Sequence, residues 1–318
     1  MQIVQQGRGF SPPSTISGGK ISMSRLKKNK EEIITAYLCV LPWILGLSIF
    51  IVGPIIASFI FSFMDYSVVL PPKFIGLSNY KKMFFEDPLL WKSLYNTLYM
   101  TVIGVPLNIL LSLSIALLLN QKIKGEAFFR TVFYLPSIVP QVAMSLLWMW
   151  ILNPQIGLIN YLLSLFGIKG PMWLASEQWA KPAFIIMGLW GIGGNMVIFL
   201  AGLQNVPQHL YDAATVEGAN IWQRFRYVTL PMLSPTIFFV LIMGIIGTLQ
   251  IFTQAYIMTA GGPMDSTLFY VYHLFNKAFR DFHMGYASAM AWFLFIIVFA
   301  VTMLNLKLSP RWVYYETE

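Results

Sequence analysis

Charge is what this sequence has least of. Asp, Glu, Lys and Arg make up 11% of its 318 residues, while 57% are hydrophobic. Soluble domains carry about 25% charged residues. A chain of this length with so few charges cannot cover a folded domain with a water-facing surface. We therefore expect an all-α integral membrane protein whose main solvent is the lipid bilayer.

Cysteine and histidine are also scarce. The one cysteine, Cys39, lies inside an apolar run, so no disulfide framework and no Cys/His zinc spacing can form. His209, His273 and His283 are scattered outside the apolar runs, where we expect surface or helix-end positions. No paired carboxylates indicate acid–base catalysis, and no G-x-x-x-x-G-K-[ST] phosphate loop is present. The sequence predicts neither a metal site, nor a bound cofactor, nor an enzyme.

Long apolar runs are what the sequence does have. A membrane-spanning helix needs about 20 apolar residues without charge. Every Lys, Arg, Asp and Glu falls outside six such runs, and a charge at mid-bilayer is costly. The predicted spans are Ile33–Phe63, Leu94–Leu119, Thr131–Leu152, Ala183–Leu203, Met232–Thr259 and Tyr286–Leu306.

The distribution of basic residues predicts the topology. With the N-terminus inside, the cytoplasmic segments carry 13 Lys and Arg and the external loops carry 8. Both termini are then cytoplasmic, with residues 1–32 as a disordered basic tail and residues 309–318 as a short C-terminal tail. The net charge is +8, and six of the 21 Lys and Arg lie in the first 30 residues, ahead of the first span, so the basic residues indicate membrane lipid rather than nucleic acid.

A polar loop over residues 205–235 separates the fourth and fifth spans. His209–Ala214 is expected to form a short helix with a small-residue face, and Ala219–Phe225 a second one. Gly218 can join them because it adopts backbone conformations that other residues avoid. The Asp212 carboxylate is available to pair with an arginine of a partner. Pro231 then starts the next span, since proline suits the first helical turn.

The pattern of this loop resembles a known family. It is similar to the coupling loop of sugar-type permeases of type I ABC importers, close relatives of the maltose-system larger permease. The matching residues are Asp212, Ala213, Ala214, Gly218, Ala219, Leu230, Pro231 and Pro235. Further resemblance lies in Arg130–Pro136, the Trp148, Asn153, Gly157 and Asn160 spacing, Thr259–Pro263 and Gly285–Ala289. It covers roughly residues 33–308, a six-span permease domain of the MetI-like fold.

The resemblance implies one subunit of a heteromeric importer in a bacterial cell membrane. Its partners would be a second homologous permease, two cytoplasmic ATPase subunits that hold ATP and Mg, and an external binding protein that delivers a sugar or oligosaccharide. The implied ATPase-coupling residues are Asp212, Ala213, Ala214, Glu217, Gly218, Ala219, Leu230 and Pro231. The family loop usually begins with Glu where Asp212 stands, and often has Asp where Glu217 stands. The maltose-system relative also has extra N-terminal spans and a large external insertion, which this chain lacks.

Polar residues inside the fourth and fifth spans are the candidates for a substrate pathway. They are Trp190, Asn195, Thr248, Gln250, Gln254 and Tyr256. Amides, hydroxyls and rings suit a sugar, although the same amides can instead bond one helix to another. Several positions that are polar in the family are Gly188, Gly191, Gly244 and Ile251 here. The glycines around residue 191 indicate either close helix packing or a helix break toward a pathway.

Other functions are compatible with parts of this pattern. A related permease for another neutral solute or a polyol would show the same loop and spans. A six-span channel working without ATP would not need the ordered loop. A rhomboid-like protease is excluded because it needs a Ser–His pair at membrane depth, and no histidine lies in a span.

Overall fold

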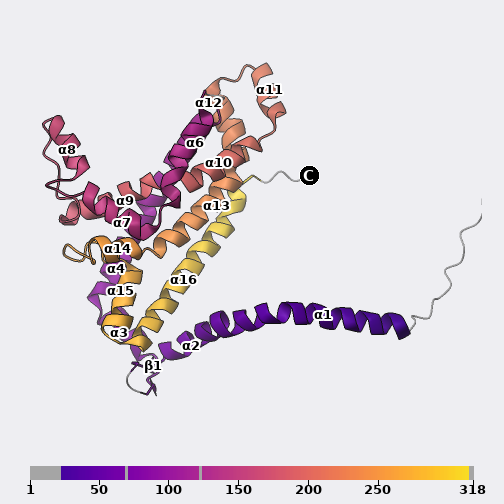
Figure 1. Cartoon of the computed structure of the whole chain (residues 1–318), viewed down its shortest axis with the longest axis vertical. Coiled ribbons are helices and arrows are strands. Elements are labelled where there is room, and N and C mark those ends of the chain that lie inside the picture. The colour runs from indigo at the N-terminus through magenta and orange to yellow at the C-terminus, as the bar shows by residue number, and fades with distance from the viewer. Residues whose placement is uncertain (1–22, 69–70, 122–123, 315–318) are drawn as a thin grey trace, which may run out of the picture. The chain divides into compact units, whose positions relative to one another are not determined.

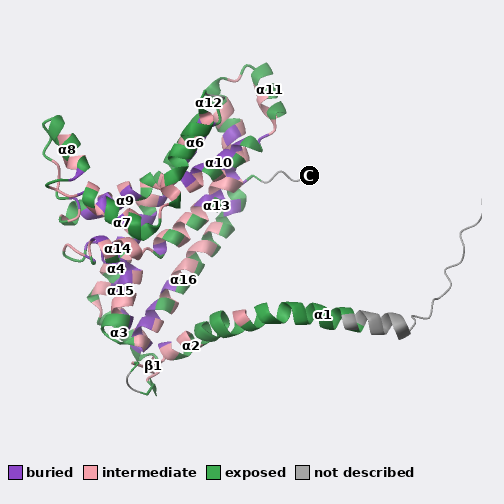
Figure 2. Ribbon diagram, viewed as in Figure 1, coloured by how far each residue is buried: buried purple, intermediate pink, exposed green. Residues whose placement is uncertain are grey.

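The computed structural model describes residues 23–68, 71–121 and 124–314, which divide into two units, Met1–Ala57 and Ser58–Glu318. Helix α1 (Met23–Leu47) lies in the first unit and continues through a π-helical turn, η1 (Ser48–Val52), into α2 (Gly53–Ser62), whose last five residues belong to the second unit. The stretch Glu32–Ser62 is long and apolar enough to cross a membrane, and it is largely exposed (Figure 2). The helix begins before the predicted start of the span, because Lys and Glu are good helix formers. Of the predicted disordered tail, residues 1–22 lie outside the described residues, and the disorder predicted for residues 23–32 is wrong.

Among its described residues, the regular structure of the second unit is helical apart from one short hairpin (Figure 1). Its elements are β1 (Met64–Asp65), β2 (Lys73–Phe74), α3 (Ser78–Phe85), α4 (Pro88–Tyr99), η2 (Met100–Gly104), α5 (Val105–Leu119), α6 (Glu126–Tyr134), η3 (Leu135–Ile138), α7 (Gln141–Ile151), α8 (Leu158–Leu165), α9 (Glu177–Trp190), α10 (Gly193–Gln204), α11 (Gln208–Val216), α12 (Ile221–Arg224), η4 (Phe225–Thr229), α13 (Leu230–Leu249), α14 (Thr253–Met258), α15 (Tyr270–Phe275), η5 (Asn276–Arg280), α16 (Met284–Leu308) and η6 (Ser309–Arg311). The turns η2, η4 and η5 are π-helical.

Four helical stretches in the described residues are long and apolar enough to span a bilayer, and two bent pairs bring the number to as many as six. The third predicted span contains the sharper of the two bends, since α6 with η3 meets α7 at 100°. Pro136 and Pro140 explain it, because each lacks an N–H donor and restricts the residue before it. Val139 is accordingly extended, with ψ 128°. The prediction of a single continuous helix over Thr131–Leu152 is therefore wrong.

The fourth predicted span bends by 49° where α9 gives way to α10, at Gly191 and Ile192. This break corresponds to the second of the two interpretations of the glycine cluster. Close helix packing, the first interpretation, also holds at Gly193, because a Cβ there would lie 2.3 Å from the Phe133 carbonyl oxygen. The glycines therefore serve both a helix break and a close approach of two backbones.

Helices α5, α10 and α13 form one apolar core. Leu113, Met196, Phe199 and Leu233 are buried in it. The C-terminal tail packs on this bundle, since the ring centroid of Trp312 lies 5.7 Å from that of Phe238 on α13.

Candidate functional site

A cavity of about 300 Å³ lies where several helices of the second unit are interrupted. The π-helical turn η2, the ends of α9 and α10 on either side of their bend, and the break between α13 and α14 all contribute residues to its wall. Irregular backbone at membrane depth is tolerated where it lines a cavity or is buried in protein. The breaks in these helices therefore coincide with the space that they enclose.

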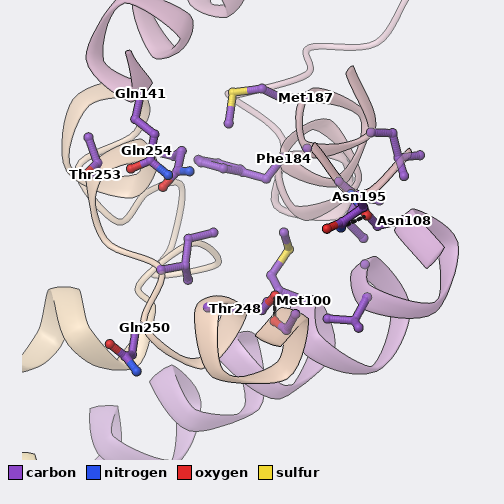
Figure 3. A pocket seen from close by; sticks show the side chains of 18 of the residues that line it. Met100, Asn108, Gln141, Phe184, Met187, Asn195, Thr248, Gln250, Thr253 and Gln254 are labelled. Atoms are coloured by element: carbon purple, nitrogen blue, oxygen red, sulfur yellow. Dashed lines mark hydrogen bonds between the residues drawn. The ribbon is translucent and has the colours of Figure 1, made fainter. Parts of the chain in front are cut away.

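The wall of the cavity is uncharged among the described residues and carries amides and hydroxyls. The amides of Gln141 and Gln254 lie on one side, and those of Asn108 and Asn195 on the other (Figure 3). The polar lining residues are Asn108, Gln141, Asn195, Thr248, Gln250, Thr253 and Gln254. Phe184, Phe252 and Met187 are among the apolar ones. This combination suits an uncharged ligand with several hydroxyl groups and an apolar face.

Two of the polar side chains are held by contacts within the protein. Asn195 Nδ2 donates to Asn108 Oδ1 at 2.7 Å, which joins α10 to α5. Thr248 Oγ1 donates to the Gly244 carbonyl at 2.8 Å, within its own helix. Within the described part of the chain, Gln141 and Gln254 make no such side-chain bond, so their amides are available to a ligand.

Four of the six residues predicted for the substrate pathway line the cavity, namely Asn195, Thr248, Gln250 and Gln254. Trp190 and Tyr256 do not. Trp190 packs edge-on against Trp148 of α7 at 6.1 Å between centroids, and Tyr256 stacks on Phe252 at 5.5 Å. Both rings lie against aromatic neighbours outside this wall, and their part in a substrate pathway stays a prediction.

Sequence reasoning missed Asn108 and Gln141, which belong to the second and third predicted spans. Each is an intramembrane amide, the signal that identified the other candidates. Gly188 and Gly244, where the family carries polar residues, also line the cavity. A Cβ at Gly188 would meet nothing within 4 Å, so the missing side chain leaves open volume.

The loop between α10 and α13 forms two short helices, as predicted. Gly218 joins α11 to α12 with φ +80°, a conformation that favours glycine. Asn220 caps α12 in a capping box with Gln223. The loop is tied to the start of the fifth span by a 3.0 Å hydrogen bond between the hydroxyls of Tyr211 and Thr229.

The predicted coupling residues form an exposed surface. Asp212, Ala213, Glu217 and Gly218 are exposed, and Ala214 is half-buried. A shallow hollow of about 450 Å³ is lined by Ala213, Ala214, Glu217, Gly218 and Ala219, and Asp212 lies outside it. Leu230 and Pro231 instead form the first turn of α13 and lie outside this hollow.

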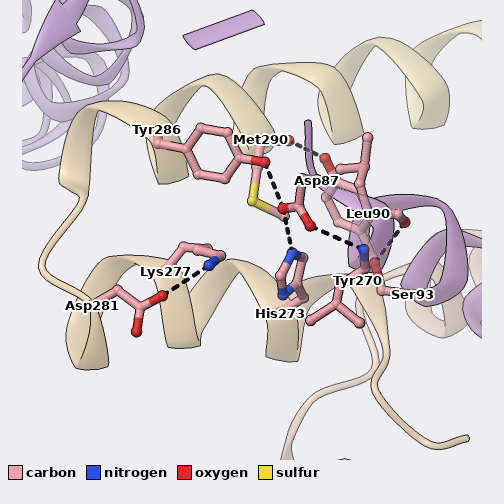
Figure 4. A network of polar contacts seen from close by, with 10 residues as sticks. Asp87, Leu90, Ser93, Tyr270, His273, Lys277, Asp281, Tyr286 and Met290 are labelled. Atoms are coloured by element: carbon pink, nitrogen blue, oxygen red, sulfur yellow. Dashed lines mark hydrogen bonds and ion pairs between the residues drawn. The ribbon is translucent and has the colours of Figure 1, made fainter. Parts of the chain in front are cut away.

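A buried polar network joins α4, α15 and α16 (Figure 4). Asp87 caps α4, and its Oδ2 accepts from Tyr286 Oη at 2.6 Å and pairs with His273 Nε2 at 2.8 Å. Burial would raise the pKa of the Asp87 carboxyl, but hydrogen bonds from His273 and Tyr286, with the positive influence of His273 and Lys277, hold that pKa well below its usual range. The expected surface position of His273 is wrong, because its side chain is 2% exposed, although the residue does lie in the last turn of α15.

Comparison with known proteins identifies the class. Residues 108–314 match the family of binding-protein-dependent transport system inner membrane components. The chain is 42% identical over 304 residues to the probable ABC transporter permease protein YesP of Bacillus subtilis (strain 168), covering 94% of this chain and 98% of that protein. It is 35% identical over 292 residues to the lactose transport system permease protein LacF of Rhizobium radiobacter, covering 89% and 96%.

The fold is also that of a solved transporter. A crystal structure of a bacterial ABC transporter involved in the import of the acidic polysaccharide alginate contains a chain that matches with a TM-score of 0.80. The match covers 90% of this chain and 99% of that one at 22% identity. The chain therefore belongs to the family of binding-protein-dependent transport system inner membrane components. It is a multi-pass membrane permease with the importer fold, and the resemblance found in its loop is confirmed.

Proposed function

We propose that this chain forms the translocation pathway of an ATP-driven importer that moves a sugar or oligosaccharide into the cytoplasm of a bacterium. The observation that carries the proposal is the uncharged cavity at the helix breaks, lined by amides, hydroxyls and aromatic rings. Relatives named for sugar transport support the same substrate class.

The chemistry of the cavity favours a sugar over a charged solute. Gln141 and Gln254 can both donate to and accept from hydroxyl groups, and Phe184 and Phe252 supply apolar surface. An anionic solute would need a cation in the wall, and the described lining residues include none. The ring carbons of a sugar can lie on an aromatic face while its hydroxyls reach the amides.

The loop between α10 and α13 is the proposed contact with the ATPase subunits. Its exposed surface carries the small residues Ala213 and Gly218 near Asp212, and their size allows a partner to approach the backbone closely. Motion there would pass to α13 through the Tyr211–Thr229 hydrogen bond, and α13 carries Gly244 and Thr248 in the cavity wall. In this proposal the loop and both termini are cytoplasmic, two ATPases hold ATP and Mg, and a second permease closes the pathway.

An external binding protein is the proposed source of substrate. The family description includes dependence on a binding protein. The loops joining α7 to α9 and α14 to α15 are on the external side in the proposed topology, and Asn160 orders the first of them by donating to the Pro154 and Pro171 carbonyls.

Uptake measurements test the proposal directly. A strain lacking the gene would be given radiolabelled maltose, lactose, trehalose and sorbitol, with and without the wild-type gene. We expect ATP-dependent uptake of at least one saccharide to be restored by the wild-type gene and not by Gly218→Trp. Restored uptake of sorbitol alone would instead identify a polyol permease. Restored uptake that persists after ATP depletion would identify a channel.

Purification tests the assembly separately. The tagged chain would be isolated from its native membrane in mild detergent, and co-purifying proteins identified by mass spectrometry. We expect a homologous permease and a P-loop ATPase. A homo-oligomer that recovers no ATPase even after crosslinking would contradict the coupling role of the loop.

A further inference from the structure

Phe252 connects the cavity to a series of aromatic rings outside it. The ring lines the cavity and stacks on Tyr256 of α14, with centroids 5.5 Å apart and planes inclined by 21°. It also lies 5.0 Å from Phe275 at the end of α15. Phe252 therefore belongs both to the cavity wall and to the series of aromatic rings outside it.

The series continues away from the cavity and becomes more exposed. Phe275 lies 5.6 Å from Tyr256 and 5.0 Å from Phe279 in η5. Phe252 and Phe275 are half-buried, whereas Tyr256 is 44% exposed and Phe279 57% exposed. Neighbouring rings are thus in contact along the whole path from the cavity wall to an exposed ring.

Polar groups accompany the rings at the outer part of this path. The Arg280 guanidinium lies 5.7 Å from the ring centroid of Tyr272, the buried residue against which Phe252 and Tyr256 both pack. Arg280 is exposed and offers N–H donors beside the aromatic surface.

The position of this surface is fixed from the opposite side of α15. His273 on that helix is buried against Asp87 at the start of α4, and Tyr286 of α16 donates to the same carboxylate oxygen. The π-helical turn η5 continues α15, and it places Phe279 one turn beyond Phe275 with the two rings in contact. A mobile loop could not hold four rings in register, whereas this anchored segment does.

We propose that Tyr256, Phe275 and Phe279 form an outer stacking subsite that receives a sugar ring before it reaches the cavity. The inference rests on the proposed function and adds a second binding position to it. The apolar C–H face of a sugar ring lies on an aromatic ring, and Arg280 donates to its hydroxyls. Successive rings let the sugar advance toward Phe252 while part of its apolar face stays covered. Isolated aromatic residues of an interfacial belt would not need continuity with the cavity.

Alanine variants of the outer rings test this subsite in the complete importer. Phe279→Ala and Tyr256→Ala would be expressed with all partner subunits, and uptake of labelled maltose, lactose and trehalose measured at limiting concentration. We expect uptake of the transported saccharide to fall about fivefold, which corresponds to the loss of one ring contact. Phe279→Tyr keeps the ring and should retain uptake, which separates stacking from a folding defect.

The stacked pair Phe295 and Phe299 on α16 provides a matched control. Their centroids are 6.0 Å apart, and they are 55% and 53% exposed. Phe295→Ala and Phe299→Ala should leave uptake unchanged. Wild-type uptake in both Phe279→Ala and Tyr256→Ala, or an equal loss in the controls, would overturn the subsite.

Failure of the subsite and failure of the proposed function give different results. If Gln254→Leu lowers uptake while Phe279→Ala does not, the cavity stands and the outer subsite is wrong. If the wild-type importer takes up none of the three saccharides, the proposed function and the subsite both fall.

Discussion

Asn195 and Asn108 meet across two helices at the wall of the cavity, with 2.7 Å between the amide nitrogen of the first and the amide oxygen of the second. Asn195 lies near the start of α10, just after the bend, and Asn108 lies in the first turn of α5. The pair sets how closely the bent span approaches its neighbour at the cavity.

This pair should show measurable coupling. Asn195→Ala and Asn108→Ala should each lower the free energy of unfolding by roughly 1 kcal/mol, since hydrogen bonds between membrane helices contribute about that much. The double variant should cost less than the sum, because the second substitution removes no further bond. Thermal unfolding in detergent measures the effect. Asn205→Ala, at the exposed end of α10, is the control, and strictly additive losses at positions 108 and 195 would contradict the contact's role.

The unpaired amides of the cavity should govern transport more than stability. Gln141→Leu and Gln254→Leu should lower saccharide uptake about tenfold, since a sugar hydroxyl would lose its partner in a desolvated site. Unfolding temperatures should change little. Gln178→Leu, at an exposed position of α9, should leave uptake intact. Unchanged uptake in both cavity variants would show that these amides do not contact the substrate.

Gly218 should be required for the shape of the docking loop. A Cβ there meets no atom within 4 Å, so a side chain disturbs the loop through its φ of +80° rather than by collision. Gly218→Ala should cost about 1 kcal/mol locally, and Gly218→Trp should abolish ATP-driven uptake by blocking the approach of a partner.

Gly167 offers a matched control for that backbone effect. It has φ +72° and open space around it, in the loop that follows α8. Gly167→Ala should have a similar local cost without loss of coupling to ATP hydrolysis. Equal loss of uptake in the Gly167→Ala and Gly218→Ala variants would mean that loop strain alone, not docking, explains the result.

The Asp87 network should make stability depend on pH in the acid range. The pKa of Asp87 is lower in the folded protein than its unfolded value of about 3.9, so its contribution is fully present above that value and is lost as pH falls toward the folded pKa. Asp87 should therefore leave the unfolding temperature unchanged near neutral pH and cause it to decline below about pH 4.

Asp87→Asn should lower the unfolding temperature at pH 7 and weaken the decline in acid. Thermal unfolding from pH 7 to pH 3 measures both effects. Asp281→Asn removes a partly exposed carboxylate that pairs with Lys277 at 2.9 Å, so its effect should be small, as for most surface ion pairs. An acid decline in Asp87→Asn as steep as in the wild type would exclude this carboxylate as its cause.

Several features of the site were predictable because they depend on local chemistry. Gly218 and the capping residues of α12 specify the turn and the start of a short helix within a few residues of sequence. Asn195 and Gln254 were recognisable because an amide is unusual in an apolar run. Asn108 and Gln141 carried the same signal, but nothing local indicates that the second and third spans meet the fourth and fifth around one cavity.

The sequence by itself determined that the chain resides in a membrane, roughly where its apolar stretches lie, and that the loop between the fourth and fifth spans forms two short helices joined at Gly218. Those properties follow from local composition in a medium that rejects charge. Only the tertiary structure decided that the third span bends by 100°, that Trp190 and Tyr256 lie against aromatic neighbours outside the cavity wall, and that His273 is buried on Asp87. These depend on contacts between residues far apart in sequence, such as positions 87 and 273, and on packing that selects one orientation for each side chain.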